Sequence, residues 1–224
     1  MANPLEAIPP VTLEEQALHR LREAILDDHF PPGSQINQVQ VAALLGVSRG
    51  TVRAATRKLE EEGLVTNIPN RGTFVTTPDK KSIDDLYCVR AVLEAYGVKL
   101  AVERCTEEDI HRFIGLVTDM QDAAKRGDTS EVIRLDFLVH EFFIQLSGNS
   151  FLSDTWSIIK VHVRRALSFR HRSYPNLQEI ADSHLPFIEL LQKRKAEEAA
   201  KIMENHIHEA RLDIIQHYVP KGSS

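Results

Sequence analysis

Cysteine is scarce in this chain of 224 residues, and neither Cys88 nor Cys105 belongs to a C-x-x-C pair. A disulfide framework is therefore excluded, and a reduced, cytosolic compartment is expected. No window reaches the roughly 18 apolar residues that a membrane span needs. The N-terminus also lacks a basic start followed by an apolar run. We therefore expect a cytoplasmic protein with neither a secretory signal nor a membrane partner.

An excess of positive charge is also lacking. The formal net charge is -5 at pH 7, which at first argues against a nucleic-acid partner. The distribution of charge matters more than the total. Residues 49–58 contain four basic side chains and no acidic one, and Arg71 follows nearby. A local basic face on an acidic chain is consistent with sequence-specific DNA binding by a dimer.

The basic segment follows a glycine turn. Gly46 suits the left-handed residue that ends a helix, and Ser48 is a favourable N-cap for the next helix. In that second helix Arg49, Arg53 and Arg57 recur at i, i+4 spacing, so their side chains share one face. This layout is typical of a helix-turn-helix whose second helix enters the major groove of DNA. The alternative is an ordinary solvated basic helix.

Two short strand-like segments after this helix, 64–66 and 73–75, predict a β-hairpin. Between them lies the turn Asn70-Arg71-Gly72, with glycine for a positive φ. A hairpin that directly follows a recognition helix is a wing. Arg71 at its tip is placed to reach a phosphate or the minor groove. The alternative is a surface hairpin with a solvated arginine.

The segments before the turn are also predicted by local signals. Residues 1–11 carry three prolines and little periodicity, so we expect a flexible arm. Thr12 and Glu15 form a T-x-x-E capping box at the start of an amphipathic helix. That helix ends near Phe30, before a proline-rich turn. Residues 39–45 supply the short helix that precedes the glycine turn.

Several spaced motifs run through residues 12–76: Leu21-Arg22-x-x-Ile25, Phe30-x-Pro32-Gly33, Leu44-x-Gly46-Val47-Ser48-Arg49, Val52-Arg53, Leu59-x-x-x-Gly63-Leu64-Val65 and Arg71-Gly72. Together they resemble the winged-helix domain of the GntR family of bacterial transcription regulators. With Arg57 added from the arginine face, the residues expected to contact operator DNA are Ser48, Arg49, Thr51, Arg53, Arg57, Arg71 and Gly72. Gly50-Thr51 replaces the family's usual Thr-Pro, which leaves the operator sequence open.

The remainder of the chain shows no strand pattern. We expect a DNA-binding domain at 12–77, a linker at 78–81 with Ser82 as the next helix cap, an effector domain at 82–219 and a tail at 220–224. The predicted amphipathic helices in the effector domain are approximately 82–104, 106–126, 129–147, 150–171, 176–193 and 195–217. The predicted fold is therefore mainly α, a winged helix-turn-helix followed by a bundle of about six helices.

Four side chains that can bind metal fall on predicted apolar faces of the bundle. Asp136 and His140 lie at i, i+4 in one segment, and His184 and His206 each lie in the apolar stripe of another. Buried polar groups need partners, and convergence on a divalent metal is one way to satisfy all four. Zinc is expected first, with nickel, manganese or iron as alternatives. A histidine in such a stripe is more often a satisfied core residue, and that alternative stays open.

The motifs of this half are Leu86-x-x-x-Arg90-x-x-x-Glu94, Asp136-x-x-x-His140, Ser147-Gly148-Asn149, His184 and His206. They resemble the FCD effector domain of FadR-type members of the GntR family. The resemblance implies a metal held by Asp136, His140, His184 and His206, beside a pocket for a small organic acid. Arg90 matches a position that faces this pocket, and its guanidinium suits a carboxylate. Asn149 and Arg165 are weaker effector candidates, with a turn amide and a surface charge as the alternatives.

These observations predict a metabolite-responsive transcription regulator, not an enzyme. We expect a homodimer that binds a palindromic double-stranded operator and associates with the nucleoid when bound. Repression is the expected direction, and activation is the alternative, because the direction depends on where the operator lies relative to the promoter. A regulator that senses the metal ion itself is one alternative. A metal-dependent enzyme is another, because three imidazoles and a carboxylate can hold a metal that activates water. No further acid or base is spaced as a catalytic partner, which argues against an enzyme.

Overall fold

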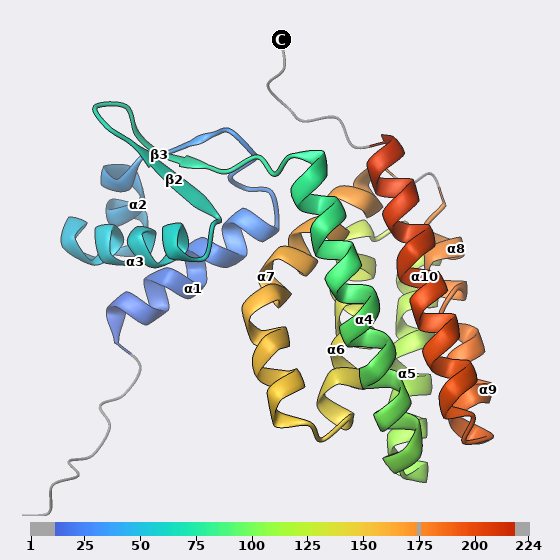
Figure 1. Ribbon diagram of the computed structural model, residues 1–224. Coiled ribbons are helices and arrows are strands. Elements are labelled where there is room, and N and C mark those ends of the chain that lie inside the picture. The colour runs from blue at the N-terminus through green and yellow to red at the C-terminus, as the bar shows by residue number, and fades with distance from the viewer. Residues whose placement is uncertain (1–11, 174–175, 218–224) are drawn as a thin grey trace, which may run out of the picture. The chain divides into compact units, whose positions relative to one another are not determined.

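The computed structural model describes residues 12–173 and 176–217 (Figure 1). The predicted arm at 1–11 and the predicted tail at 220–224 lie outside these residues. The chain divides into two units, one up to Thr77 and one from Pro78 to Val219. Within the described ranges, no helix is both long and apolar enough to cross a membrane.

The first unit contains three helices and a small sheet: α1 (Leu13–Leu26), β1 (Gln35–Ile36), α2 (Gln38–Leu45), α3 (Arg49–Glu61), β2 (Val65–Ile68) and β3 (Gly72–Val75). The predicted helix caps are confirmed, but α1 ends at Leu26 and not near Phe30, because the chain leaves the helix at Asp27 and Asp28 has a positive φ of 64°. The capping box of Thr12 and Glu15 starts α1. Gly46 ends α2 with φ 65°, and Ser48 caps α3 by accepting from the backbone amide of Thr51.

The sheet has three antiparallel strands in the order β1-β3-β2, where the hairpin prediction gave two. The extra strand β1 has only two residues, and Gln35 pairs with Phe74 while Ile36 pairs with Thr73. A strand this short shows no alternation of apolar and polar residues, so the sequence pattern did not predict it. Its pairing holds Thr73 and Phe74 of β3 in the sheet.

Side-chain hydrogen bonds join helix α3 to its neighbours. The Gln38 amide donates to the hydroxyls of Thr56 on α3 and Thr73 on β3, at 3.2 and 3.0 Å. On the other side, Arg22 of α1 forms two hydrogen bonds with Glu62 at the end of α3. Because both contacts cross between elements, they hold α3 in a fixed orientation toward the wing and α1.

The second unit is helical throughout its described residues, as predicted. Its helices are α4 (Lys80–Arg104), α5 (Glu107–Lys125), α6 (Thr129–Leu146), α7 (Ser150–Ser173), α8 (Leu177–Asp182), α9 (Leu185–Gln192) and α10 (Ala196–His217). Two expectations need correction. The first helix begins at Lys80, not Ser82, because the Asp79 carboxylate caps it by accepting from the Ser82 amide at 2.6 Å.

The second correction concerns the predicted helix 176–193, which is divided into α8 and α9. The break falls at Ser183 and His184. Pro186, in the first turn of α9, explains it, because a proline has no amide to donate and its ring clashes with the carbonyl four residues earlier. The described part of the bundle therefore has seven helices where the sequence pattern predicted six.

Helices α4 and α10 lie side by side along the bundle (Figure 1). Near the start of α4, Asp84 accepts two hydrogen bonds from Arg211, at 2.6 and 2.9 Å. Near its end, Lys99 contacts Glu197. Since higher numbers on α4 pair with lower numbers on α10, the two helices are antiparallel.

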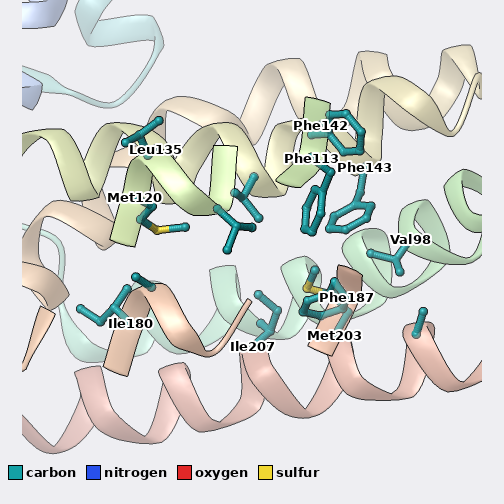
Figure 2. Close-up of a cluster of buried hydrophobic side chains, with 14 of the residues drawn as sticks. Val98, Phe113, Met120, Leu135, Phe142, Phe143, Ile180, Phe187, Met203 and Ile207 are labelled. Carbon is teal, nitrogen blue, oxygen red and sulfur yellow. The ribbon is translucent and has the colours of Figure 1, made fainter. Parts of the chain in front are cut away.

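The apolar faces of the bundle helices form a continuous core (Figure 2). Four phenylalanines from α5, α6 and α9 contribute ring contacts with centroids 4.9 to 5.6 Å apart, and they are Phe113, Phe142, Phe143 and Phe187. A smaller cluster around Trp156 of α7 packs against α6 and α4.

Candidate metal centre and nucleic-acid interface

Three histidines from separate parts of the bundle converge. His140 lies on α6, His184 lies at the break before α9, and His206 lies on α10. Each offers a ring nitrogen, and these three atoms lie within 4.8 Å of one another. His140 and His184 are buried, and His206 is half-buried. The chain thus brings together three of the four side chains that the sequence suggested as metal ligands.

Asp136, the fourth, lies one turn before His140 on α6. Its Oδ1 atom is 3.2 Å from Nε2 of His184 and 3.8 Å from Nε2 of His140. In a tetrahedral zinc site with Zn–N bonds of about 2.0 Å, neighbouring ligand atoms are roughly 3.3 Å apart. The spacing of Asp136 and His184 therefore fits a shared metal ion, and the donor set of three imidazoles and one carboxylate suits zinc and related divalent metals.

The opposite ring nitrogens of two of these histidines face protein oxygens. Nδ1 of His184 is 3.0 Å from the backbone carbonyl oxygen of Ile180. Nδ1 of His140 contacts Oε2 of Glu94. Hydrogen bonds at Nδ1 fix the ring so that Nε2 is presented to a metal. Both imidazoles are thus oriented by groups that do not themselves belong to the cluster.

The helix break places His184 in the cluster. His184 is the N-cap residue of α9, but its side chain makes no capping hydrogen bond. The prediction that His184 lies within one continuous helix is therefore wrong. Its side chain is nevertheless fully buried. The turn before Pro186 aims the imidazole inward instead.

The protonation state of His206 also suits a cation. Burial lowers the pKa of His206 well below its usual 6.5, and the nearby His184 and His140 lower it further, while Asp136 opposes them. A neutral imidazole is the form that coordinates metal. His206 is therefore held in its coordinating form at neutral pH.

Arg90 and Glu94 form a buried pair beside this cluster. Nε of Arg90 donates to Oε1 of Glu94 at 2.7 Å, and its guanidinium lies 4.7 Å above the ring of Tyr87. Burial would raise the pKa of Glu94, but the charges of Arg90 and His140 outweigh it, and the pKa is lowered. Glu94 is thus an ionised bridge between Arg90 and His140. Its i, i+4 spacing from Arg90 was the sequence signal for this pair.

The two terminal nitrogens of Arg90 form no hydrogen bond with the described residues. The residue is 0 % exposed, yet neither Nη1 nor Nη2 has a hydrogen-bond partner among the described residues. Almost all buried polar groups in proteins are paired. Two parallel N–H groups in this state form a fork that matches the geometry of a carboxylate.

The two weaker effector candidates have other surroundings. Asn149 lies just before α7, and its side-chain oxygen accepts from the amide of Leu152 at 3.1 Å, so this group is engaged as a helix cap. Arg165 is buried on α7, with its guanidinium 5.6 Å from the ring centre of Phe169.

On the first unit, the three arginines of α3 are exposed on the face that the spacing predicted, and they are Arg49, Arg53 and Arg57. At the start of this helix, the hydroxyls of Ser48 and Thr51 lie 2.9 Å apart in a mutual hydrogen bond. Arg53 and Arg57 also line a pocket of about 270 Å³, whose wall includes Glu14 of α1. A basic helix face of this kind matches the phosphate-lined major groove.

The wing has a defined tip. Arg71 is exposed, and its backbone carbonyl accepts from the Gln35 amide at 2.8 Å. Gly72 has φ 104°, and a Cβ there would lie 2.8 Å from the Gln35 side-chain nitrogen. Glycine is therefore required by the backbone at this turn, whether or not it also approaches DNA.

Comparisons with known proteins match both units. Residues 13–75 match the model of the bacterial regulatory proteins of the gntR family, and residues 85–209 match the FCD domain. The chain is 34 % identical over 179 residues to the Nta operon transcriptional regulator of Aminobacter aminovorans, covering 80 % of this chain and 83 % of that protein. It is 26 % identical over 210 residues to the transcriptional repressor RspR of Escherichia coli K12, covering 93 % and 91 %.

Solved structures share the fold. A GntR-type transcriptional regulator from Rhodococcus sp. RHA1 superposes with a TM-score of 0.79 at 24 % identity, covering 92 % of this chain and 99 % of that one. Escherichia coli McbR/YncC gives a TM-score of 0.78 at 21 % identity, covering 92 % and 98 %. The relatives are transcription regulators, so the enzyme alternative is rejected. The chain belongs to the GntR family of DNA-binding transcription regulators, in the group whose second domain is an FCD domain.

Proposed function

We propose that a small carboxylate-bearing metabolite, bound beside a metal ion in the helical unit, controls operator binding by this regulator. The observation that carries the proposal is the buried Arg90 guanidinium. Its two Nη atoms have no partner among the described residues, and Glu94 connects it to the histidine cluster. A carboxylate would satisfy both nitrogens at once.

The metal ligands in this proposal are Asp136, His140, His184 and His206. Zinc is the first candidate, and nickel, manganese or iron have suitable ligand preferences. The metal would strengthen the fold and offer a coordination position to the effector. Arg165 is a secondary candidate for effector contact, because it is buried on α7 in the same bundle.

For the DNA interface, we propose that α3 lies in the major groove and the wing reaches the backbone or the minor groove. The contacting residues would be Ser48, Arg49, Thr51, Arg53, Arg57, Arg71 and Gly72. The exposed arginine face of α3 supports this assignment. Two such helices in a homodimer would match a palindromic operator.

An exposed apolar surface supports the homodimer. On α4, Val92 is 72 % exposed and Tyr96 lies on the same helix face. On α7, which contacts α4, Ile158 is 73 % exposed and Phe151 is also exposed. Exposed large apolar side chains on two helices that contact each other favour an interface there. We therefore place the dimer contact on α4 and α7.

The effector can change operator affinity only if it binds one arrangement of the regulator better than another. Operator DNA then changes effector affinity by the same factor. Repression is the expected direction, supported by the relative RspR, which is named a repressor. The domain boundaries proposed from the sequence, with a DNA-binding part at 12–77 and an effector part at 82–219, belong to the same proposal.

The test is elemental analysis of the purified full chain, with a thermal-shift screen of small organic acids alongside. One transition metal per chain and a carboxylate that raises the melting temperature are the expected results. A metal without any responding acid, with DNA affinity that follows the metal concentration, would identify a metal-sensing regulator instead. If the protein contains no metal and no acid raises its melting temperature, the proposed control mechanism is wrong and only the DNA-binding function remains.

A further inference from the structure

A row of basic side chains on α3 ends in an acidic one. Arg49, Arg53 and Arg57 are each four residues apart, and Glu61 continues the row by one more step. All four side chains are exposed. The basic face that is proposed to meet DNA is therefore limited at its C-terminal end by a carboxylate.

The side of this face is limited by α1. The neighbouring row of α3 consists of Gly50, Ala54 and Lys58. Nζ of Lys58 lies 3.4 Å from Oε1 of Glu14 on α1, and the two side chains are 45 % and 38 % exposed. The fourth basic residue of the segment 49–58 is thus paired with a carboxylate of the protein.

A hollow of about 270 Å³ lies between these groups. Gly50 and Ala54 leave this space on α3 because they have little or no side chain. The charged residues that line the hollow are Arg53, Arg57, Lys58, Glu14 and Glu61. A DNA phosphate that approached the hollow would meet three cations and two carboxylates at close range, and the carboxylates would cancel much of the attraction.

Glu14 is the carboxylate of α1 that contacts Lys58 directly. The adjacent Glu15 is engaged in the capping box, where it accepts from the amide and the hydroxyl of Thr12, at 2.9 and 3.1 Å. These hydrogen bonds are the main reason that the pKa of Glu15 is lowered, and the charge of Lys58 adds a smaller effect. Lys58 therefore lies near two carboxylates, and Glu14 is the one with which it forms an ion pair.

The pair of Lys58 and Glu14 has a clearer consequence for DNA binding than for stability. An ion pair at this exposure adds little to the stability of a fold. Each lysine that neutralises a phosphate, in contrast, adds to the affinity for DNA of any sequence. Specificity is the difference between operator and non-operator affinities, so a group that weakens non-operator binding increases it.

We propose that Glu14 is a specificity-determining residue, which keeps Lys58 from the DNA backbone and so weakens binding to non-operator sequences. The arginine row then makes the contacts to the operator, while the hollow beside it attracts phosphates only weakly. This inference rests on the DNA interface proposed above, and it adds a residue that affects DNA binding without contacting DNA.

The test measures binding of the full chain to two DNA fragments of equal length, by fluorescence anisotropy between about 50 and 200 mM salt. One fragment is an operator selected from random DNA by this protein, and the other has a random sequence. The variants are Glu14→Gln, Lys58→Gln and the double variant. Glu108→Gln is the matched control, because it removes the same charge from an exposed residue of the second unit. Arg57→Ala tests the proposed interface itself.

Glu14→Gln should bind random DNA about tenfold more tightly than wild type near 50 mM salt, and its salt dependence should steepen by about 0.9 in log–log slope, the value for one added phosphate contact. Its affinity for the operator should change less, because base contacts fix the position of α3 there. Lys58→Gln alone should not strengthen binding, and adding it to Glu14→Gln should remove the gain.

Two results would refute the inference and leave the proposed interface in place. One is a gain that persists in the double variant or appears equally in Glu108→Gln, because net charge alone would then explain it. The other is no gain in Glu14→Gln while Arg57→Ala loses operator affinity. Full operator binding by Arg57→Ala would instead reject the proposed interface, and this inference with it.

Discussion

Nδ1 of His140 on α6 contacts Oε2 of Glu94 on α4. The same carboxylate accepts from Arg90 through its other oxygen at 2.7 Å. One glutamate therefore contacts both the histidine cluster and the candidate effector arginine. A change in the position of Arg90 can reach His140 through a single side chain, and the reverse also holds.

Glu94→Gln should lower metal affinity by about 10- to 100-fold, because the carboxylate that orients His140 is lost. Competition with a fluorescent chelator measures the affinity. The matched control is Glu103→Gln, an exposed glutamate on the same helix, which should leave the affinity unchanged. Equal affinities for the two variants would remove Glu94 from the metal site.

His184→Ala should reduce the metal content below one per chain and reduce the thermal stabilisation that metal provides, since metal binding adds to the folding free energy. Chelation of the wild-type metal should lower its melting temperature in the same way. His208→Ala, on the exposed side of α10, serves as the control. A full metal complement in His184→Ala would show that the four-residue site is wrong.

Arg49→Ala should weaken operator binding by about 1–3 kcal/mol while helical content and metal content stay the same. Arg49 is exposed in the first turn of α3, where we propose that base contacts are made. An operator fragment selected from random DNA by this protein provides the probe for gel-shift titration. Arg126→Ala removes the same charge from an exposed site in the other unit and should bind normally. Undiminished binding by Arg49→Ala would contradict the recognition-helix assignment.

Gly72→Ala should destabilise the wing by about 1–3 kcal/mol, because φ 104° is unfavourable for alanine and its Cβ would press on Gln35. Faster amide exchange in β2 and β3 is the expected signature in hydrogen-exchange mass spectrometry. Gly115→Ala is the control, in an open helical position, and should be neutral or stabilising. Wing protection that survives Gly72→Ala would refute this account of the turn.

Val92→Glu should convert the dimer to a monomer, because a charge would be placed in the proposed contact between the α4 and α7 surfaces. Sedimentation velocity measures the change. Leu212→Glu, at an exposed apolar residue of α10, should leave the dimer intact. A dimeric Val92→Glu variant would locate the interface elsewhere.

The sequence predicted those features whose causes are local. The capping box at Thr12, the glycine turn at Gly46 and the arginine spacing of α3 each depend on residues within a few positions of one another, so the pattern contains the physical cause. Pro186 is a local signal for the helix break at His184, but the apolar periodicity of this segment continues across it and favours a single helix.

Features set by packing were not predictable in the same way. The two-residue strand β1 exists because β3 lies beside it. The contact between Glu94 and His140 joins residues of different helices, and whether the Tyr87 hydroxyl finds a hydrogen-bond partner among the described residues depends on every element around it. Such relationships arise only when the whole bundle has assembled.

Helix α4 connects two parts of the molecule through one continuous backbone. It begins at Lys80, five residues after the last residue of the wing strand β3, and it carries Arg90 and Glu94. Its 25 residues form a rod about 37 Å long, and Arg90 lies about 15 Å from its first turn. The helix can therefore act as a lever, since a tilt of about 5° at Arg90 would move its first turn by about 1 Å. A ligand that tilts α4 at Arg90 would therefore displace the point where the DNA-binding unit is attached, without a rearrangement of the bundle.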